Sequence, residues 1–74
     1  MKRFTIETHG YRWKVHGSEV GGKWGCHLVE LDGPFPLDRA VDKALLETLR
    51  TAIASFLEKD IEDVKRIPAD LILA

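Results

Sequence analysis

Residues 37–59 read LDRAVDKALLETLRTAIASFLEK, and this stretch decides the fold because it is long, periodic and free of glycine and proline. The pattern predicts one helix of about 35 Å over residues 37–59. Asp38 is its expected N-cap, since Pro34 and Pro36 hinder an earlier start. Its apolar residues recur at intervals of three and four, the spacing of a buried helix face: Val41, Leu45, Leu49, Ala52, Ile53 and Phe56.

The apolar face of this helix is broad, because Leu46 and Leu57 flank the main stripe. One small sheet is not expected to cover such a face completely. The charged residues of the helix fall on the opposite side and indicate a solvated surface, on which Glu47 and Arg50 are spaced for a weak ion pair.

The residues before the helix predict three short strands, because apolar and polar side chains alternate there. His9-Gly10 suits a two-residue hairpin turn, and the glycines of residues 17–22 indicate that the second strand breaks or bulges at that point. The expected strands are residues 3–8, 11–16 and 23–31.

The third strand changes phase along its length. Cys26 and Leu28 share a face with Trp24, whereas Val29 and Leu31 fall on the other face. A β-bulge within the strand would bring both apolar groups to one side, and we expect one there. Trp13 and Trp24 lie in phase with aliphatic neighbours, which favours a place in the core over a role as stacking platforms for bases.

The residues after the helix predict a short second helix at 61–67, with Asp60 as its N-cap and Pro68 beyond its end. The chain then ends in an apolar tail, residues 71–74, which needs cover. Three alternatives stay open: the tail pairs as a fourth strand, packs on the long helix, or reaches a partner subunit.

Together these elements predict one α+β domain over residues 1–74, in two layers. A three-stranded antiparallel β-meander packs on one long helix, followed by the short helix and the apolar tail. A domain of this size has a marginal core, and its single cysteine excludes an internal disulfide, so we expect a homodimer or a complex with a partner protein. The expected interaction residues are Leu46, Leu57, Leu71, Ile72 and Leu73.

Charge is unevenly distributed although the net charge is −1. Residues 1–27 carry five basic and two acidic side chains, whereas residues 28–74 carry six basic and ten acidic ones. The main interpretation is complementarity within the fold or across a dimer; the alternative is a basic sheet face that binds a nucleic acid. That face would consist of Arg3, Arg12, Lys14, His16 and His27.

Candidates for catalysis or metal binding are few. One cysteine and three dispersed histidines do not match the paired ligands of a zinc site. Cys26 and His27 are adjacent, so in a regular strand they point to opposite faces. We therefore expect no catalytic residue, no metal and no cofactor.

No apolar run reaches the roughly 20 residues of a membrane span, and Met1-Lys2-Arg3 is not followed by the apolar segment of a signal peptide. The expected location is the cytoplasm.

Residues 36–45, PLDRAVDKAL, follow a short antiparallel sheet, and this order is similar to the strand-then-helix half of HicB-like antitoxin domains. The resemblance covers residues 24–58. It implies a helix packed on a three-stranded sheet and a small toxic ribonuclease as partner. Those domains place a further short strand before the helix, which the run Leu31-Asp32-Gly33 does not provide, and no residue role is transferred.

The sequence thus favours a non-enzymatic protein-interaction module with an accessory or regulatory role, which self-associates. The alternative is a nucleic-acid-associated or antitoxin-like regulator that uses the basic sheet face.

Overall fold

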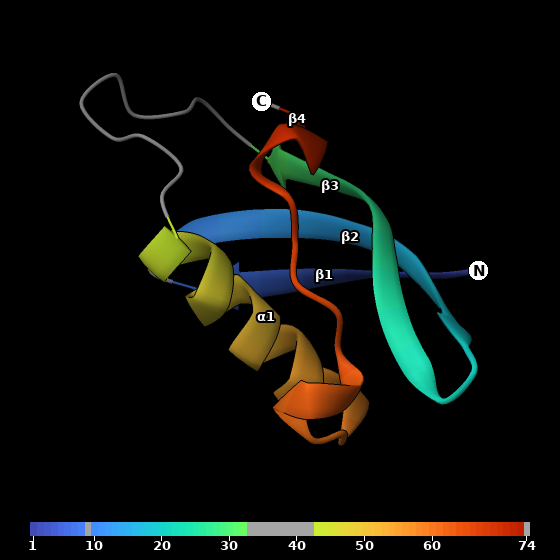
Figure 1. Cartoon of the computed structure of the whole chain (residues 1–74). Coiled ribbons are helices and arrows are strands. Elements are labelled where there is room, and N and C mark those ends of the chain that lie inside the picture. The colour runs from blue at the N-terminus through green and yellow to red at the C-terminus, as the bar shows by residue number, and fades with distance from the viewer. Residues whose placement is uncertain (9, 33–42, 74) are drawn as a thin grey trace.

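The structure is a computed structural model that describes residues 1–8, 10–32 and 43–73, the last two by their backbone alone. Its main elements are β1 (Lys2–Thr8), β2 (Tyr11–Val20), β3 (Lys23–Asp32) and α1 (Lys43–Leu57), followed by β4 (Ile72–Leu73) (Figure 1). Short 3-10 turns lie at Ile61–Asp63 and Ala69–Leu71. The α+β class and the antiparallel meander predicted from the sequence are confirmed.

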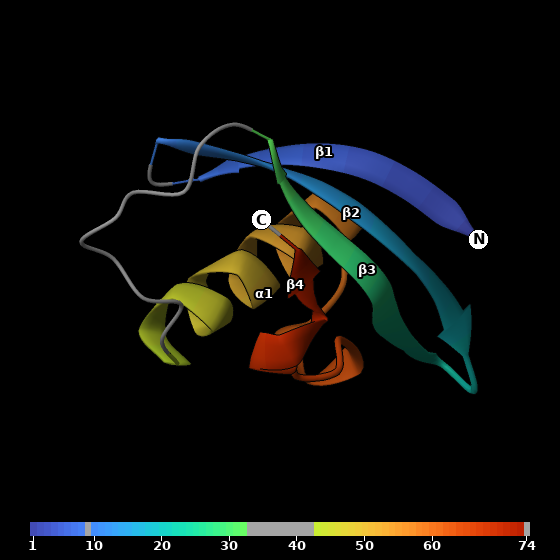
Figure 2. The ribbon, with the colours of Figure 1, turned by 90° about the horizontal axis from the view of Figure 1, so that it is seen from above.

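The sheet has the strand order β1-β2-β3-β4. The first three strands are antiparallel, whereas β4 runs parallel to β3 opposite Val29 and Glu30. The backbone of Ile72 and Leu73 thus adopts the first of the three alternatives for the tail, a fourth strand. Figure 2 shows α1 and the segment that leads to β4 on the same side of the sheet.

The predicted β-bulge in the third strand is confirmed. His16 pairs with Leu28 and the next residue, Gly17, pairs with Cys26, so His27 is the extra residue of β3. The buried positions change phase across it, from Trp24 to Val29. The bulge therefore lets one strand direct both of its apolar segments to the helix side.

The sequence predicts that the second strand breaks or bulges at residues 17–22. It does not break, because β2 continues to Val20 and turns at Gly21-Gly22, but its register with β3 shifts between His16 and Gly17. The φ angles of these two glycines, 62° and 80°, lie in the left-handed region that glycine adopts most readily. Gly17 serves close packing instead. A Cβ there would lie 2.4 Å from the carbonyl oxygen of Gly25 and from the indole ring of Trp24.

The core lies between the sheet and α1. Both tryptophans are buried, as predicted, and the sheet contributes the apolar residues that alternate with exposed ones. The most deeply buried side chains are Trp13, Val15, Val29, Leu49, Ile53 and Val64.

The helix α1 ends at Leu57, two residues before the predicted end, because Glu58 has a φ of 56°. The predicted start at Leu37 lies outside the described residues. The predicted helix over residues 61–67 is wrong in extent: one 3-10 turn, Ile61–Asp63, is followed at once by extended backbone at Val64. Val64 is fully buried and pairs with Trp24 of β3, and this contact competes successfully with helix formation.

Candidate functional site

The outer side of β3, which we call the covered edge, is occupied by the chain itself. Val64 forms a parallel bridge with Trp24, and the Lys65 N–H donates a hydrogen bond to the Trp24 carbonyl oxygen at 2.8 Å. Further along β3, β4 pairs with Val29 and Glu30. Backbone groups at this edge thus form hydrogen bonds with other segments of the same chain.

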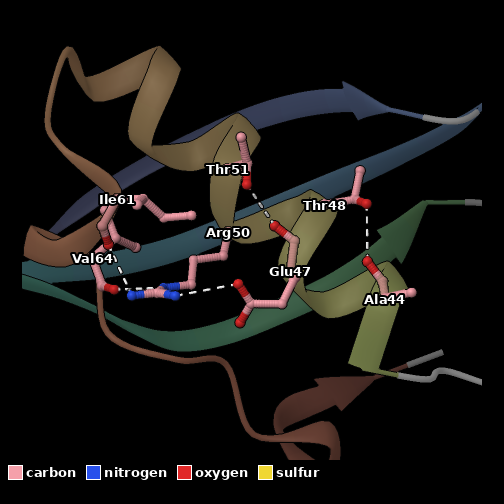
Figure 3. Close-up of polar contacts among 7 residues, drawn as sticks. All are labelled: Ala44, Glu47, Thr48, Arg50, Thr51, Ile61 and Val64. Atoms are coloured by element: carbon pink, nitrogen blue, oxygen red, sulfur yellow. Dashed lines mark hydrogen bonds and ion pairs between the residues drawn. The ribbon is translucent and has the colours of Figure 1, made fainter.

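Arg50 fixes the segment that covers this edge (Figure 3). Its Nε donates to the carbonyl oxygen of Val64 at 2.7 Å and its Nη2 to that of Ile61 at 2.9 Å. Its Nη1 contacts Glu47 Oε2 at 3.2 Å. The Arg50 side chain is only 16 % exposed and its bond to Val64 is partly buried, so these bonds tie α1 to the chain that follows it.

Two contacts hold the hairpin end of β2 and β3 to the same segment. Lys23 Nζ donates to the carbonyl oxygen of Glu62 at 2.9 Å, and Lys59 forms an ion pair with Glu19. The covered edge is therefore fixed at several points along its length.

The outer side of β1, which we call the open edge, differs. β1 is the terminal strand of the sheet, and none of the residues that the structure describes pairs with its outer side as a strand. An edge strand of seven residues presents N–H and C=O groups that can accept another strand.

An aromatic pair lies beside the open edge. Phe4 of β1 and Phe56 of α1 stack with ring centroids 4.4 Å apart at 15°, and Phe4 also contacts Trp24 at 5.6 Å. Phe56 is 51 % exposed, and Lys2 Nζ lies 5.8 Å from its ring centroid. The sequence pattern placed Phe56 in the buried stripe; the structure instead places it at the margin of the core.

The residues predicted to form a basic sheet face do share the face away from α1. Arg3 lies opposite His16, and Lys14 lies between Thr5 and Glu30. Arg12, however, forms ion pairs with two acidic residues of the same face: the distances are 3.0 Å to Glu7 and 3.7 Å to Asp32. The three acids Glu7, Glu30 and Asp32 thus accompany the three cations Arg3, Arg12 and Lys14, and the described part of this face has mixed charge.

His27 and Cys26 are the side chains best suited to nucleophilic, acid–base or metal chemistry. His27, at the bulge, is exposed and lies 2.6 Å from Ser18 Oγ through Nε2. Cys26 is half-buried on the core side, and burial raises its pKa from 9.0 to about 12. A thiol with this pKa is protonated at neutral pH and is a poor nucleophile. The described residues contain no group of three or more potential metal ligands.

The predicted interaction residues are distributed over the C-terminal half. Leu46, Leu57 and Leu71 are half-buried and pack against the molecule's own core. The backbone of Ile72 and Leu73 forms β4. Leu46 also lines a groove of about 500 Å³ together with Lys43, Glu47, Arg66, Ile67 and Ala69.

Sequence reasoning missed two features of this arrangement. The helical pattern predicts a solvated position for Arg50, because the charged residues of the helix fall opposite its apolar stripe. Its carbonyl partners, however, lie 11 and 14 residues further on. No local pattern signals such contacts. The position of the Phe4–Phe56 pair could be predicted in part: β1 is the first strand of a meander, so the sequence places Phe4 on an edge strand.

No family model, curated protein or solved structure matches the chain. Within the described residues, no helix is long and apolar enough to cross a membrane. The similarity to HicB-like antitoxin domains therefore gains no support from these comparisons.

Proposed function

We propose that this chain is a non-enzymatic protein-interaction module that binds an extended segment along the open edge of β1. One observation carries the proposal: a seven-residue edge strand lies beside the half-exposed Phe56. Strand addition takes its affinity from backbone hydrogen bonds and its selectivity from side chains at alternate positions. The open edge offers both kinds of contact.

The aromatic pair supplies an apolar contact for such a segment. Phe56 is held by its stacking on Phe4, so little rotamer entropy remains to be lost on binding. Covering the exposed half of the ring would remove about 100 Å² from water, which contributes about 2.5 kcal/mol. Rigid aromatic side chains of this kind are frequent energetic centres of interfaces.

The accessory or regulatory role rests on the chemistry of the described side chains. The raised pKa of Cys26 disfavours a thiolate, and among the described residues no carboxylate forms an ion pair with His27 that would orient it toward Ser18. We therefore propose that the module acts by binding alone and regulates the partner that it binds.

A nucleic-acid-binding role is the second candidate, favoured by one observation. Arg3, Lys14 and His16 line a shallow hollow of about 300 Å³ on the sheet face away from α1. The acids of the same face oppose it, since a phosphate backbone would approach Glu7 and Glu30 as well. A salt-dependent affinity for DNA or RNA that Lys14→Glu abolishes without unfolding the protein would support this alternative.

The main proposal is tested by selection of random dodecapeptides on the immobilised protein, followed by fluorescence polarisation of the enriched peptides. Thr5→Pro removes an edge N–H and blocks strand addition, whereas Thr5→Val keeps the backbone and is the matched control. We expect peptides with alternating apolar residues that bind the wild type and Thr5→Val, and bind Thr5→Pro at least tenfold more weakly. Equal binding to all three proteins, or no enrichment on a protein that sedimentation shows to be monomeric, would exclude the open edge as the site.

A further inference from the structure

We infer that the segment which occupies the open edge is β1 of a second copy, paired antiparallel about Thr5. This inference rests on the proposed function and names its partner. The two sheets then join into one continuous sheet across a two-fold axis.

The sequence of β1 is self-complementary in this register. When two copies run antiparallel with Thr5 opposite Thr5, Arg3 lies opposite Glu7 of the partner, and Phe4 lies opposite Ile6. Each pair occurs twice because of the two-fold axis. Opposite charges thus face each other at the Arg3–Glu7 pairs and apolar residues at the Phe4–Ile6 pairs, on either side of the central Thr5 pair, and cross-strand pairs of this kind stabilise antiparallel ladders.

The other registers that keep the two apolar faces on the same side lack this match. Centring the axis on Phe4 or Ile6 places Thr5 opposite Arg3 or Glu7 and leaves the charges unpaired. Centring it on Arg3 or Glu7 brings like charges together. The Thr5 register is the one that pairs Arg3 with Glu7, so charge selects it.

The backbone agrees with the same register. In an antiparallel ladder, successive residues direct their N–H and C=O groups alternately toward and away from the neighbouring strand. Thr8 and Tyr11 form the last pair before the two-residue connection, and such flanking pairs bond to each other. Counting back from Thr8, the groups of Arg3, Thr5 and Glu7 point outward. These are the residues that the Thr5 register aligns.

The side chains at the edge are available for the contact. Arg3 has no polar side-chain partner among the described residues, and Glu7 contacts Arg12 in an exposed pair at 3.0 Å. A two-fold axis perpendicular to the sheet keeps α1 of both copies on the same face. The Phe4–Phe56 pair of each copy then lies beside the junction.

Charge exchange tests this register directly, with the dissociation constant measured by sedimentation velocity. Arg3→Glu and Glu7→Arg should each weaken the wild-type dimer at least tenfold, because each places two like-charge pairs across the axis. The double variant should dimerise within about threefold of the wild type. An equimolar mixture of the two single variants should form a 1:1 heterodimer, since every facing pair is again opposite in charge.

Folding is monitored by circular dichroism, because Glu7→Arg also removes the contact with Arg12. Arg3→Glu breaks no ion pair of the monomer, so a loss of dimer in that variant reports the interface alone. Thr5→Cys in a Cys26→Ser background should give a disulfide-linked dimer under mild oxidation, and Lys14→Cys in the same background should not.

A wild type that stays monomeric at millimolar concentration would overturn the inference. So would a dimer that all four proteins form with equal affinity. If the wild type is monomeric while selected peptides bind the edge and lose affinity for Thr5→Pro, the proposed function stands and its partner is a different protein. If neither the copy nor any peptide binds, both proposals fail.

Discussion

The two edges of the sheet are treated differently by the same chain. The covered edge is occupied by Val64, Lys65 and β4, and Arg50 fixes the segment that does so. The open edge of β1 has no strand partner among the described residues and lies beside a half-exposed aromatic ring. The difference teaches that the described chain after α1 pairs with one edge of the sheet only, which is why we propose the other edge as the binding site.

A substitution that disturbs the packing beneath the covered edge should have the largest effect on stability. Gly17→Ala places a methyl group 2.4 Å from the Gly25 carbonyl and from the Trp24 ring, and Trp24 is the residue to which Val64 pairs. We expect the free energy of unfolding, measured in urea, to fall by about 3 kcal/mol. Gly25→Ala is the matched control, since its nearest neighbour is 3.5 Å away. Equal stability of both variants would contradict the close approach of Trp24 to Gly17.

Removal of the guanidinium should loosen the segment that covers the edge. Arg50→Met keeps an unbranched apolar stem but removes the donors to the carbonyl oxygens of Val64 and Ile61, of which Ile61 still accepts from the Val64 N–H. We expect a loss of about 2 to 3 kcal/mol, seen as a fall in Tm of about 10 to 20 °C. Glu47→Gln removes only a half-exposed ion pair and should cost under about 0.5 kcal/mol. If both variants melt alike, the bonds from Arg50 to the backbone contribute nothing.

Proline distinguishes the two edges directly. Lys65→Pro removes the N–H that donates to the Trp24 carbonyl oxygen at 2.8 Å, and we expect it to cost about 2 kcal/mol. Thr5→Pro removes an outward N–H of β1 and should cost under about 1 kcal/mol. Chemical denaturation of the two variants at a concentration where the protein is monomeric measures the difference. A reversed order would mean that β1 is the edge more tightly held within the monomer.

Loss of the tail should have a smaller effect. Deletion of residues 71–74 removes the half-buried Leu71 and the pairing of β4 with Val29 and Glu30. We expect a loss of about 1 kcal/mol and a fall in Tm of about 4 to 8 °C by calorimetry. The deletion also exposes part of β3, so the truncated protein should self-associate more than the full chain. An unchanged Tm would show that β4 adds nothing to the fold.

Cys26 should give the smallest effect at neutral pH, because its contribution to stability changes only at alkaline pH. The unfolded chain releases the thiol proton near pH 9.0, whereas the folded chain releases it near pH 12. Folding thus favours the neutral thiol, and stability falls as the pH rises from about 9 to about 12. The wild type should lose more stability than Cys26→Ala between pH 8 and pH 10.5. Alkylation of the folded protein at pH 8 should also be about 1,000-fold slower than that of the unfolded chain, following the thiolate fraction.

The periodicity of apolar residues was sufficient to predict the elements that depend on a regular pattern within a short stretch of sequence. The alternation of β1, the stripe of α1 and the phase change across His27 are all properties of short windows, and each predicted its element. The predicted end of β2 at His16 is wrong, because the glycines of residues 17–22 predict a break or bulge and only the register shift occurs, at Gly17. The actual role of Gly17 depends on Trp24, which only the folded register brings against it.

The candidate site could be predicted less well, because it depends on how distant segments meet. The acids Glu30 and Asp32 share a face with Lys14 only because the bulge reverses the phase of β3, and this turns a basic face into one of mixed charge. Phe56 is in phase with Leu49 and Ile53 but lies half-exposed, since it stacks on Phe4 of the terminal strand. Both facts follow from topology and register, which periodicity does not fix.

The bulge at His27 also constrains how this chain can change in length. Deletion of one residue between Trp24 and Leu31 would bring the two apolar segments of β3 onto opposite faces. Either the indole ring of Trp24 or the side chains of Val29 and Leu31 would then point into solvent. A change of length at the Gly21-Gly22 turn does not alter which of the β3 side chains share a face. In homologous chains, insertions and deletions in this region should therefore occur at the turn, while the spacing between Trp24 and Leu31 is kept.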